Sequence, residues 1–320
     1  MSYSFDAMPV SAGEPLSFQP DGGLWWDVTS SAASSLLPQF YEAYERAFVL
    51  PDEKESLEGF RECLRLNEGE DYAKLRERYG PFRELILLAR ERVEGEIIGG
   101  ANCIAFPIGP EASLLSINLN YVFIEEPWRG KGHFRSILSG VKEAVNRTFR
   151  LADQEAQHLI FIEQNDPLKM GQSAYDQDTE YSGMDQAGRI EIWGKLGAKI
   201  VDFPYVQPPL SANQKPDRTL AFAVLGASGD EMDACLLRSH LERFFGISVL
   251  KGRDPMQDPT AAFQLEMLEG DCAAKRPIAL LALPASLKAQ LAQAIGSYRS
   301  LNDLLSAAPE TGGAILDRRD

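Results

Sequence analysis

Two glycines flanked by basic residues form the stretch of this sequence best suited to bind an anion. Residues 129–132 (Arg-Gly-Lys-Gly) follow a β-branched and aromatic run at 114–124, and apolar residues recur at helical spacing from Phe134 onward. Glycine lets a backbone approach a ligand closely, and a helix start presents unpaired N–H groups with a partial positive charge. Arg129 and Lys131 would add full charges there. The pattern predicts an anion cradle between a strand and a helix.

The common nucleotide fingerprints do not fit this turn. A Rossmann motif needs a third glycine where Arg135 stands, and the Walker Gly-Lys-Ser/Thr pattern is absent. The turn instead resembles the acyl-CoA pyrophosphate loop of the GNAT superfamily of N-acetyltransferases, Q/R-x-x-G-x-G/A. The sixth position departs, because a small residue is usual there. The resemblance implies an acyl-CoA diphosphate held by Arg129, Gly130, Lys131, Gly132, His133 and Phe134. An ordinary strand-to-helix turn with solvated basic residues is the alternative.

Composition sets broad limits on function. The chain has 320 residues and a net charge of −15, which argues against a nucleic-acid or anionic-membrane partner and suits a cationic acceptor, although solubility alone explains it equally. Four scattered cysteines without a C-x-x-C pair and a polar start indicate a reducing, cytoplasmic setting. Three histidines make a histidine-rich metal site improbable, and we expect no metal cofactor.

The order of expected elements extends the resemblance. Apolar patterns predict a strand at 23–29, helices at 37–48 and 52–79, a hairpin at 84–92 and 97–107, and strands at 114–124 and 158–163, then a helix at 189–198 and strands at 199–204 and 219–225. This succession is similar to the GNAT core over about residues 24–227. It implies an α/β fold with a central, splayed, mixed β-sheet flanked by helices.

Three segments fall outside that pattern. Residues 1–23 read as a loosely attached N-terminal arm. Residues 166–186 form an insert that we expect to be a polar loop by its composition. Residues 228–320 form a mainly helical C-terminal extension without a chemical motif, whose role is open. It could pack on the core, support a homodimer or close the acceptor site.

The resemblance also implies where the thioester lies. In this family two parallel strands, here 114–124 and 158–163, splay apart and admit pantetheine, so backbone groups near Phe123 and Ile124 would bind its amides. Asn165 matches an asparagine that often ends the second strand. One backbone N–H would polarise the thioester carbonyl while an amine attacks directly.

Attack requires a neutral amine, so a base or water chain must remove its proton. Glu125 and Glu163, near the ends of the two splayed strands, are the candidate bases, with a solvated strand-end carboxylate as the alternative for each. Asn120 alternates with Ser116 and Asn118 on one strand face and could orient acceptor or water.

The family's frequent tyrosine, which protonates the leaving thiolate in many relatives, is Trp193 here. An indole N–H is not a useful proton donor, so we expect Trp193 to be a packed core residue and leave the general acid open. Tyr175 and Tyr181 in the insert are candidates only if that segment covers the cleft.

The sequence therefore predicts an acyl-CoA-dependent N-acyltransferase that transfers an acetyl group from acetyl-CoA to a primary amine of a small molecule or peptide. A non-catalytic acyl-CoA sensor or interaction module on the same fold is the alternative. The acceptor and the acyl chain length are not specified by these residues.

Overall fold

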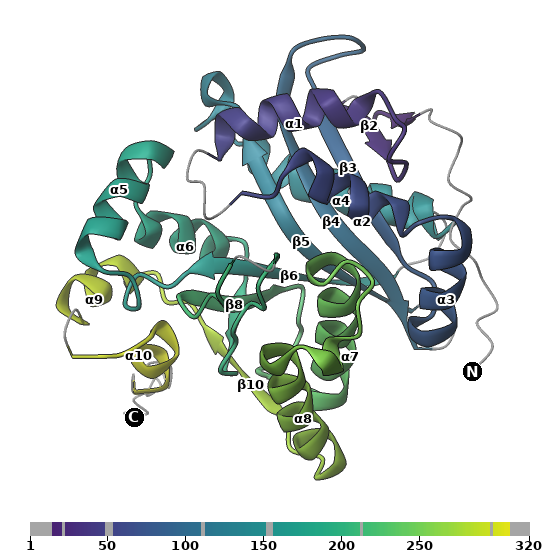
Figure 1. Cartoon of the computed structure of the whole chain (residues 1–320). Helices are drawn as coiled ribbons and strands as arrows, with labels where there is room; N and C mark the ends of the chain where they lie inside the picture. Colours follow the sequence, from purple (N-terminus) through teal and green to yellow (C-terminus); the bar gives the residue numbers. More distant parts are fainter. Residues whose placement is uncertain are drawn as a thin grey trace, which may run out of the picture.

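One mixed sheet organises the computed structural model, which describes residues 15–20, 23–48, 54–109, 113–151, 156–211, 214–294 and 297–307. Ten strands in this part of the chain lie in the order β1-β2-β3-β4-β5-β6-β8-β7-β10-β9 (Figure 1). Their bounds are β1 Leu16–Phe18, β2 Trp25–Thr29, β3 Arg83–Arg90, β4 Ile97–Ile108, β5 Leu114–Ile124, β6 Gln157–Asn165, β7 Lys199–Val201, β8 Leu220–Leu225, β9 Glu231–Met232 and β10 Ile278–Ala282. The predicted α/β fold class with a mixed sheet is confirmed.

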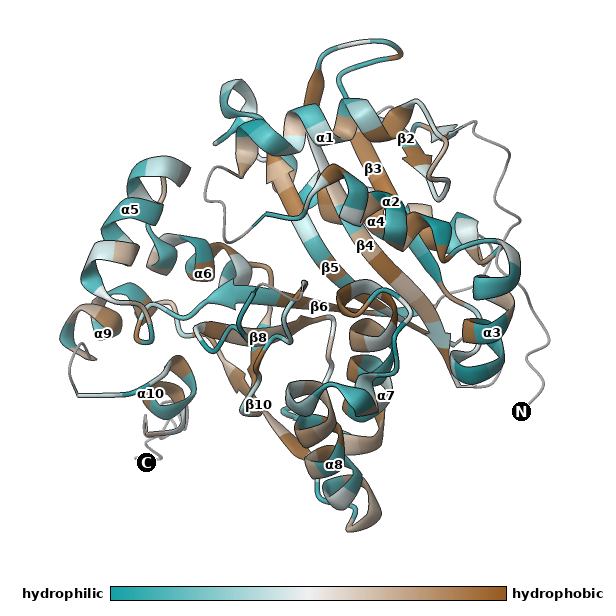
Figure 2. Ribbon diagram, in the orientation of Figure 1, coloured by the Kyte–Doolittle hydropathy of each residue, from teal (hydrophilic) through white to brown (hydrophobic). Residues whose placement is uncertain are grey.

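Helices cover both faces of the sheet. On one face, apolar residues of α4 (His133–Thr148), α6 (Gln186–Lys195), α9 (Leu287–Ala294) and α10 (Leu301–Ala307) share a core with the strands. The opposite face is covered by α1 (Leu36–Ala47), α2 (Leu57–Arg65), α3 (Gly69–Tyr79), α7 (Ala234–Phe244) and α8 (Pro259–Ala273). The strands are accordingly apolar along most of their length (Figure 2). No helix in the described ranges has both the length and the apolar character needed to cross a membrane.

The sheet opens between β5 and β6. These parallel strands pair from Leu114 and Gln157 up to Leu119 and Ile162. Beyond that point β5 stays paired with β4 as far as Ile124, while β6 continues with β8. A register shift in the β4–β5 ladder leaves Asn120 as the extra residue of a bulge at the point of divergence. The splay predicted between these two strands is therefore present.

The β3–β4 hairpin agrees with the sequence prediction. Strand β4 contains two consecutive glycines, Gly99 and Gly100, where a neighbouring strand packs closely. A Cβ added to Gly99 would lie 2.3 Å from the carbonyl oxygen of Phe123. The backbone that approaches this site is thus the neighbouring strand β5. A side chain at residue 99 would push β5 away at the far end of the open segment, where β5 ends.

The C-terminal segment is mainly helical, as expected, but it also extends the sheet. Strand β10 pairs antiparallel with β7, and β9 pairs with β10. A π-helical turn, Phe245–Val249, continues α7 and is fully buried. At the other end of the chain, β1 pairs with β2, so residues 16–18 of the expected arm belong to the sheet. Residues 1–14 and 308–320 lie outside the described residues.

The expectation of a loop over residues 166–186 is wrong. Residues Gln172–Ser182 form helix α5, which is mostly exposed and polar (Figure 2). The helix has almost no apolar stripe, so apolar periodicity could not reveal it. Its anchor is polar, because the buried Asp178 accepts hydrogen bonds from Gln186 and Arg189 of α6.

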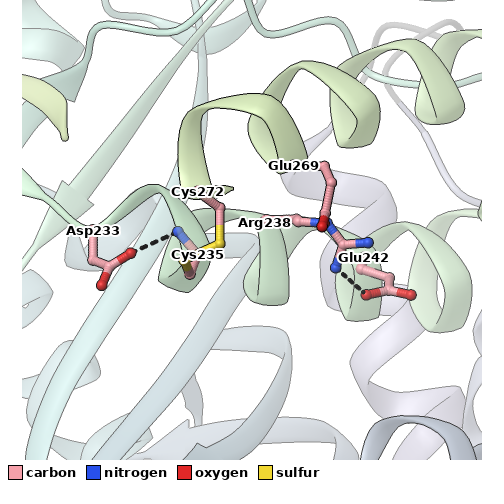
Figure 3. Close-up of a disulfide and its surroundings, with 6 residues drawn as sticks. All are labelled: Asp233, Cys235, Arg238, Glu242, Glu269 and Cys272. Carbon is pink, nitrogen blue, oxygen red and sulfur yellow. Dashed lines mark hydrogen bonds and ion pairs between the residues drawn. A yellow bond between two sulfur atoms is a disulfide. The ribbon is translucent and has the colours of Figure 1, made fainter. Parts of the chain in front are cut away.

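The four scattered cysteines, from which a reducing setting was inferred, include one disulfide pair. Cys235 of α7 and Cys272 of α8 form a disulfide across a separation of 37 residues (Figure 3). The two helices pack side by side, which spacing along the chain does not show. Cys63 and Cys103 are free and buried. The cysteine argument for a reducing compartment is therefore lost.

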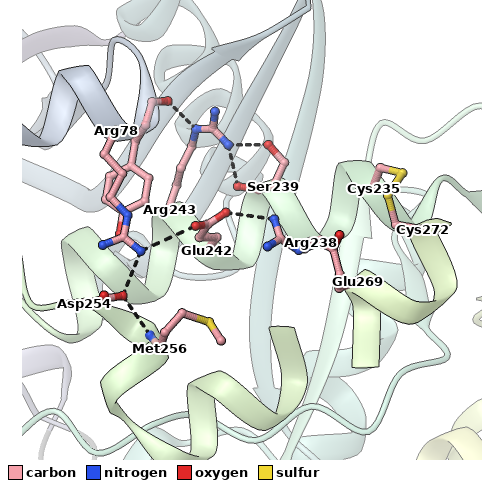
Figure 4. A network of polar contacts seen from close by, with 11 residues as sticks. Arg78, Cys235, Arg238, Ser239, Glu242, Arg243, Asp254, Met256, Glu269 and Cys272 are labelled. Atoms are coloured by element: carbon pink, nitrogen blue, oxygen red, sulfur yellow. Dashed lines mark hydrogen bonds and ion pairs between the residues drawn. A yellow bond between two sulfur atoms is a disulfide. The ribbon is translucent and has the colours of Figure 1, made fainter. Parts of the chain in front are cut away.

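Charged contacts anchor α7 to its neighbours. Arg238 on α7 contacts Glu242 at 3.1 Å and Glu269 of α8 at 2.5 Å (Figure 4). Arg78 of α3 binds Asp254 at 2.8 Å, and Arg243 donates to the backbone oxygen of Tyr79. These contacts hold the C-terminal helices firmly against the rest of the fold.

Candidate active site

The predicted anion cradle has the expected backbone form. Gly130 and Gly132 adopt φ angles of +73° and +83°, and a Cβ added to either would meet no atom within 4 Å. Helix α4 begins directly after them, at His133. Within the described residues, the backbone N–H groups of residues 130–133 have no hydrogen-bond acceptor. Four open N–H groups at a helix start provide the donors that a diphosphate needs.

The side chains of the cradle contact either the end of β5 or the Trp128 ring. Arg129 donates from Nε to the backbone oxygen of Ile124 at 3.1 Å, which fixes the turn to the end of β5. Lys131 places its Nζ 4.6 Å from the centre of the Trp128 ring, and His133 packs edge-on against the same ring. Lys131 therefore packs on the Trp128 ring beside the cradle and does not line the groove.

A groove of about 470 Å³ leads from this cradle into the open part of the sheet. Gly130, Gly132, His133 and Phe134 line one end of it, and Phe123 and Ile124 line its wall. Trp193 packs edge-on against Phe134 with 5.0 Å between ring centres and is buried, as expected for a core residue. The predicted cofactor residues of the turn and of β5 thus share one groove, apart from Lys131 and Asn165.

A second cavity, of about 180 Å³, meets the groove at the splay. Both spaces are lined by Phe48, Asn120, Tyr121, Glu163, Gln164 and Arg189. The second cavity extends under α2 and the π-helical turn to Cys63, Asn102 and Ser248. A thioester delivered along the groove would therefore meet a molecule in the second cavity beside residues 120 and 163.

Glu163 is the carboxylate at this junction. Glu163 is partly exposed because it lines the two cavities, although its carboxylate lies deep in the protein. Burial raises the pKa of Glu163 to about 7, a hydrogen bond from the Tyr205 hydroxyl lowers it, and the charge of Asp217 raises it further. No lysine or arginine nitrogen of the described residues lies within ion-pair distance of it. A carboxylate with this pKa is suited to exchange a proton near neutral pH.

A directional chain of hydrogen bonds holds Asn120. The Asn118 amide donates to Asn120 Oδ1 at 2.9 Å, and the Asn120 amide donates to Asn102 Oδ1 at 3.0 Å. His240 Nε2 lies 3.2 Å from Asn118 Oδ1, an acceptor, so that nitrogen carries the proton, and Nδ1 accepts from Ser116 at 2.8 Å. Burial lowers the pKa of His240 well below its usual value, which keeps the ring neutral. Ser116, Asn118 and Asn120 share one face, as predicted.

Two of the predicted residues are not brought to the positions expected. The Glu125 carboxylate binds Arg46 of α1, with 2.7 Å between Oε1 and the guanidinium, and lines neither cavity. Asn165 lines the second cavity, not the cofactor groove. The residues that sequence reasoning missed are Tyr205, Ser248 and Glu84, because nothing local marks a residue that reaches the site across the fold.

The described residues contain no group of three or more His, Cys, Asp or Glu side chains placed to hold a metal ion. The chemistry that can be built here from side chains is proton transfer by Glu163 and hydrogen bonding by amides.

Comparison with known proteins finds distant matches among solved structures. No protein-family model matches the sequence, and a search of curated proteins finds no match. Among solved structures, a protein from Bacteroides thetaiotaomicron described as a GNAT-family acetyltransferase is 16% identical, with a TM-score of 0.41, and the match covers 68% of this chain and 92% of that one.

Two further matches are of the same kind. The ribosomal-protein-S18-alanine N-acetyltransferase of Escherichia coli is 14% identical, with a TM-score of 0.34 and 64% and 97% coverage. The diaminobutyrate acetyltransferase of Paenibacillus lautus, in complex with its substrate and coenzyme A, is 13% identical, with a TM-score of 0.29 and 67% and 96% coverage. At these values the assignment of chemistry rests on the geometry of this chain.

Proposed function

We propose that this protein is an acyl-CoA-dependent N-acyltransferase that transfers an acetyl group from acetyl-CoA to a primary amine. The observation that carries the proposal is the position of Glu163, a deeply buried carboxylate where a groove starting at an open amide cradle meets a second cavity. The groove would take acetyl-CoA, and the second cavity would take the amine.

The cradle would hold the diphosphate through the N–H groups of residues 130–133, with Arg129 fixed beside them. Pantetheine would follow the groove along Phe123 and Ile124, where the freed backbone of β5 can hydrogen-bond its amides. The thioester then reaches the junction beside Asn120. This path uses the groove throughout and needs no movement of the sheet.

The transfer step follows from the groups at the junction. Glu163 accepts a proton from the bound ammonium, and the neutral nitrogen attacks the thioester carbon. A freed N–H of β5 would stabilise the negative charge that develops on the carbonyl oxygen. The C–S bond then breaks, and the departing thiolate of CoA takes the proton that the nitrogen loses as the amide forms; a thiol with a pKa of about 8.5 needs no strong acid for departure. Trp193 and Phe134, which flank the groove, can remain apolar walls.

The acceptor is proposed to be a small amine. The second cavity carries the carboxylates of Glu55, Glu163 and Asp217, and its Arg189 is held by Asp178 of α5. Glu55 is matched by Lys251 at 3.0 Å, whereas Glu163 has no cationic partner among the described residues. This negative balance and a volume of about 180 Å³ favour a small cationic molecule.

Two measurements on the purified full chain test the proposal. Calorimetry with acetyl-CoA and CoA should show binding, and thiol release should appear with a panel of amines. Glu163→Gln should abolish most of the release and keep CoA binding, whereas Glu125→Gln should retain release because that carboxylate is bound to Arg46. No binding of acetyl-CoA at millimolar concentration would defeat the proposal. Binding without release on any acceptor would favour the sensor function.

A further inference from the structure

The second cavity has a polar end that the transfer step does not use. Ser248, in the π-helical turn after α7, lines this end, and its side chain is almost completely buried. Its hydroxyl donates a hydrogen bond to Oε1 of Glu84 on β3. Since the hydroxyl hydrogen is committed to Glu84, the oxygen of Ser248 presents only lone pairs to the cavity. This end of the cavity therefore accepts hydrogen bonds.

Behind Ser248 lies an uncompensated carboxylate. Glu84 is 0% exposed, and its Oε2 makes no hydrogen bond with any described residue. The amide of Asn102, another cavity residue, lies close enough to favour the ionised carboxylate, while its own hydrogen bond, at 3.0 Å, goes to the backbone oxygen of Leu85. Within the described ranges no lysine or arginine nitrogen lies within 4 Å of the Glu84 carboxylate. A buried charge without a partner is unfavourable, and a cation in the cavity beside Ser248 would offset that cost.

The pKa of Glu84 agrees with this picture. Burial raises it to about 7, an effect that Ser248 and Asn102 offset only in part. An ammonium ion beside Ser248 would favour the ionised carboxylate and lower that pKa again.

The two ends of the cavity are separated across the sheet. In the strand register Glu84 lies opposite Ile104, Ile104 opposite Asn118, and Asn118 opposite Phe161, two residues before Glu163. Three strand spacings place Glu84 and Glu163 about 14 Å apart across the strands. A molecule that reaches both ends must be elongated.

We propose that Ser248, backed by Glu84, forms a cation subsite that binds a second protonated amine of the acceptor while Glu163 receives the amine that is acylated. The acceptor is then a linear diamine or a longer polyamine. This inference rests on the proposed function for the reacting end, but the subsite itself is a binding site and is testable without turnover. It also assigns the C-terminal segment, which carries Ser248, a role in acceptor selection.

Matched acceptors test the subsite. 1,6-Diaminohexane and 1,8-diaminooctane, which are long enough to approach both ends, are compared with n-heptylamine and n-nonylamine, which replace one ammonium by a methyl group of similar size. In the wild-type protein kcat/KM should be higher for each diamine by about tenfold or more, since a hydrogen bond to a charged group is lost with the monoamine. In Ser248→Ala and in Glu84→Gln the ratio of kcat/KM for a diamine to kcat/KM for its matched monoamine should fall toward one, with the loss appearing in KM for the diamine. Ser286→Ala, an exposed serine of the C-terminal segment, is the control.

A merely structural role of Ser248 or Glu84 would lower activity with diamines and monoamines alike. That result, or equal use of both amine types by the wild-type protein, overturns the subsite. Should Glu84→Gln fail to fold, Ser248→Ala decides the question alone.

Calorimetry separates this inference from the proposed function. Diamine binding to the CoA-loaded protein should weaken about tenfold or more in Ser248→Ala, even if no acceptor is ever acylated. Binding that persists unchanged in Ser248→Ala, or no diamine binding to the wild-type protein, rules the subsite out, whatever the thiol-release assay shows.

Discussion

Replacing Tyr205 by phenylalanine should move the pH dependence of acyl transfer upward. The Tyr205 hydroxyl donates to the Glu163 carboxylate, and this bond is what holds the pKa of Glu163 down against burial. Burial keeps that pKa at about 7 in the intact site. Without the hydroxyl the ionised form loses the hydrogen bond from Tyr205, while the burial stays the same.

The size of the shift follows from the bond that is removed. A hydrogen bond to a charged group contributes about 1.5–3 kcal/mol, and 1.36 kcal/mol corresponds to one pKa unit, so the pKa should rise by roughly one to two units. At pH 7 about half of Glu163 is ionised in the wild-type protein, against roughly 1–10% in Tyr205→Phe. The variant should therefore be about five- to fifty-fold slower at pH 7 and should approach the wild-type rate as the pH rises.

The assay is kcat/KM for thiol release from about pH 5.5 to pH 10 at low amine concentration. Alkylamines stay protonated until about pH 10, so the rising limb near neutrality belongs to the enzyme base. Glu163→Gln should lose that limb together with about 10²- to 10⁴-fold in rate. Both variants should bind CoA with wild-type affinity, because Tyr205 lies outside the groove. A rising limb that stays in place in Tyr205→Phe, or normal turnover by Glu163→Gln, would refute Glu163 as the base.

Three further perturbations have defined outcomes. Because the folded pKa of Glu84 is raised to about 7 from 4.5, the folded state holds this proton more tightly, so stability is full below pH 4.5 and falls as the pH rises to 7, by about 3 kcal/mol. Urea denaturation of Glu84→Gln at pH 4 and at pH 8 should lack this loss, and an identical pH dependence in both proteins would contradict it. Gly132→Ala places a Cβ at a φ of +83°, which costs about 1–2 kcal/mol. Calorimetry should therefore show CoA affinity about five- to thirty-fold weaker. Unchanged affinity would mean that CoA binding does not depend on this backbone conformation. Replacing Cys235 and Cys272 by serine opens a 37-residue loop and should lower the free energy of unfolding by roughly 4 kcal/mol with CoA binding intact, whereas loss of CoA binding would mean that this bond supports the groove.

Local patterns in the sequence were sufficient to predict the elements that depend only on neighbouring residues. A β-branched run, a glycine pair and an apolar helical repeat define β5, the cradle and α4, because strand pairing, positive φ angles and helix amphipathicity are each decided within a few residues. The order of such elements supported the resemblance to the GNAT core, and that resemblance implied the mixed sheet and its opening. Helix α5 was not predicted, for the same reason, because a polar surface helix carries no apolar repeat.

Only the tertiary structure decided which of these residues act together. Glu125 and Glu163 are equivalent as strand-end carboxylates in the sequence, until Arg46, 79 residues earlier, binds one of them and Tyr205 contacts the other. Glu84 and Ser248 are 164 residues apart, and Cys235 and Cys272 are 37 apart. Contacts of this kind depend on how whole layers pack, and the pKa of a carboxyl group depends on the burial that this packing creates. For that reason the cradle could be predicted from the order of residues, while the base and the far end of the acceptor cavity could not.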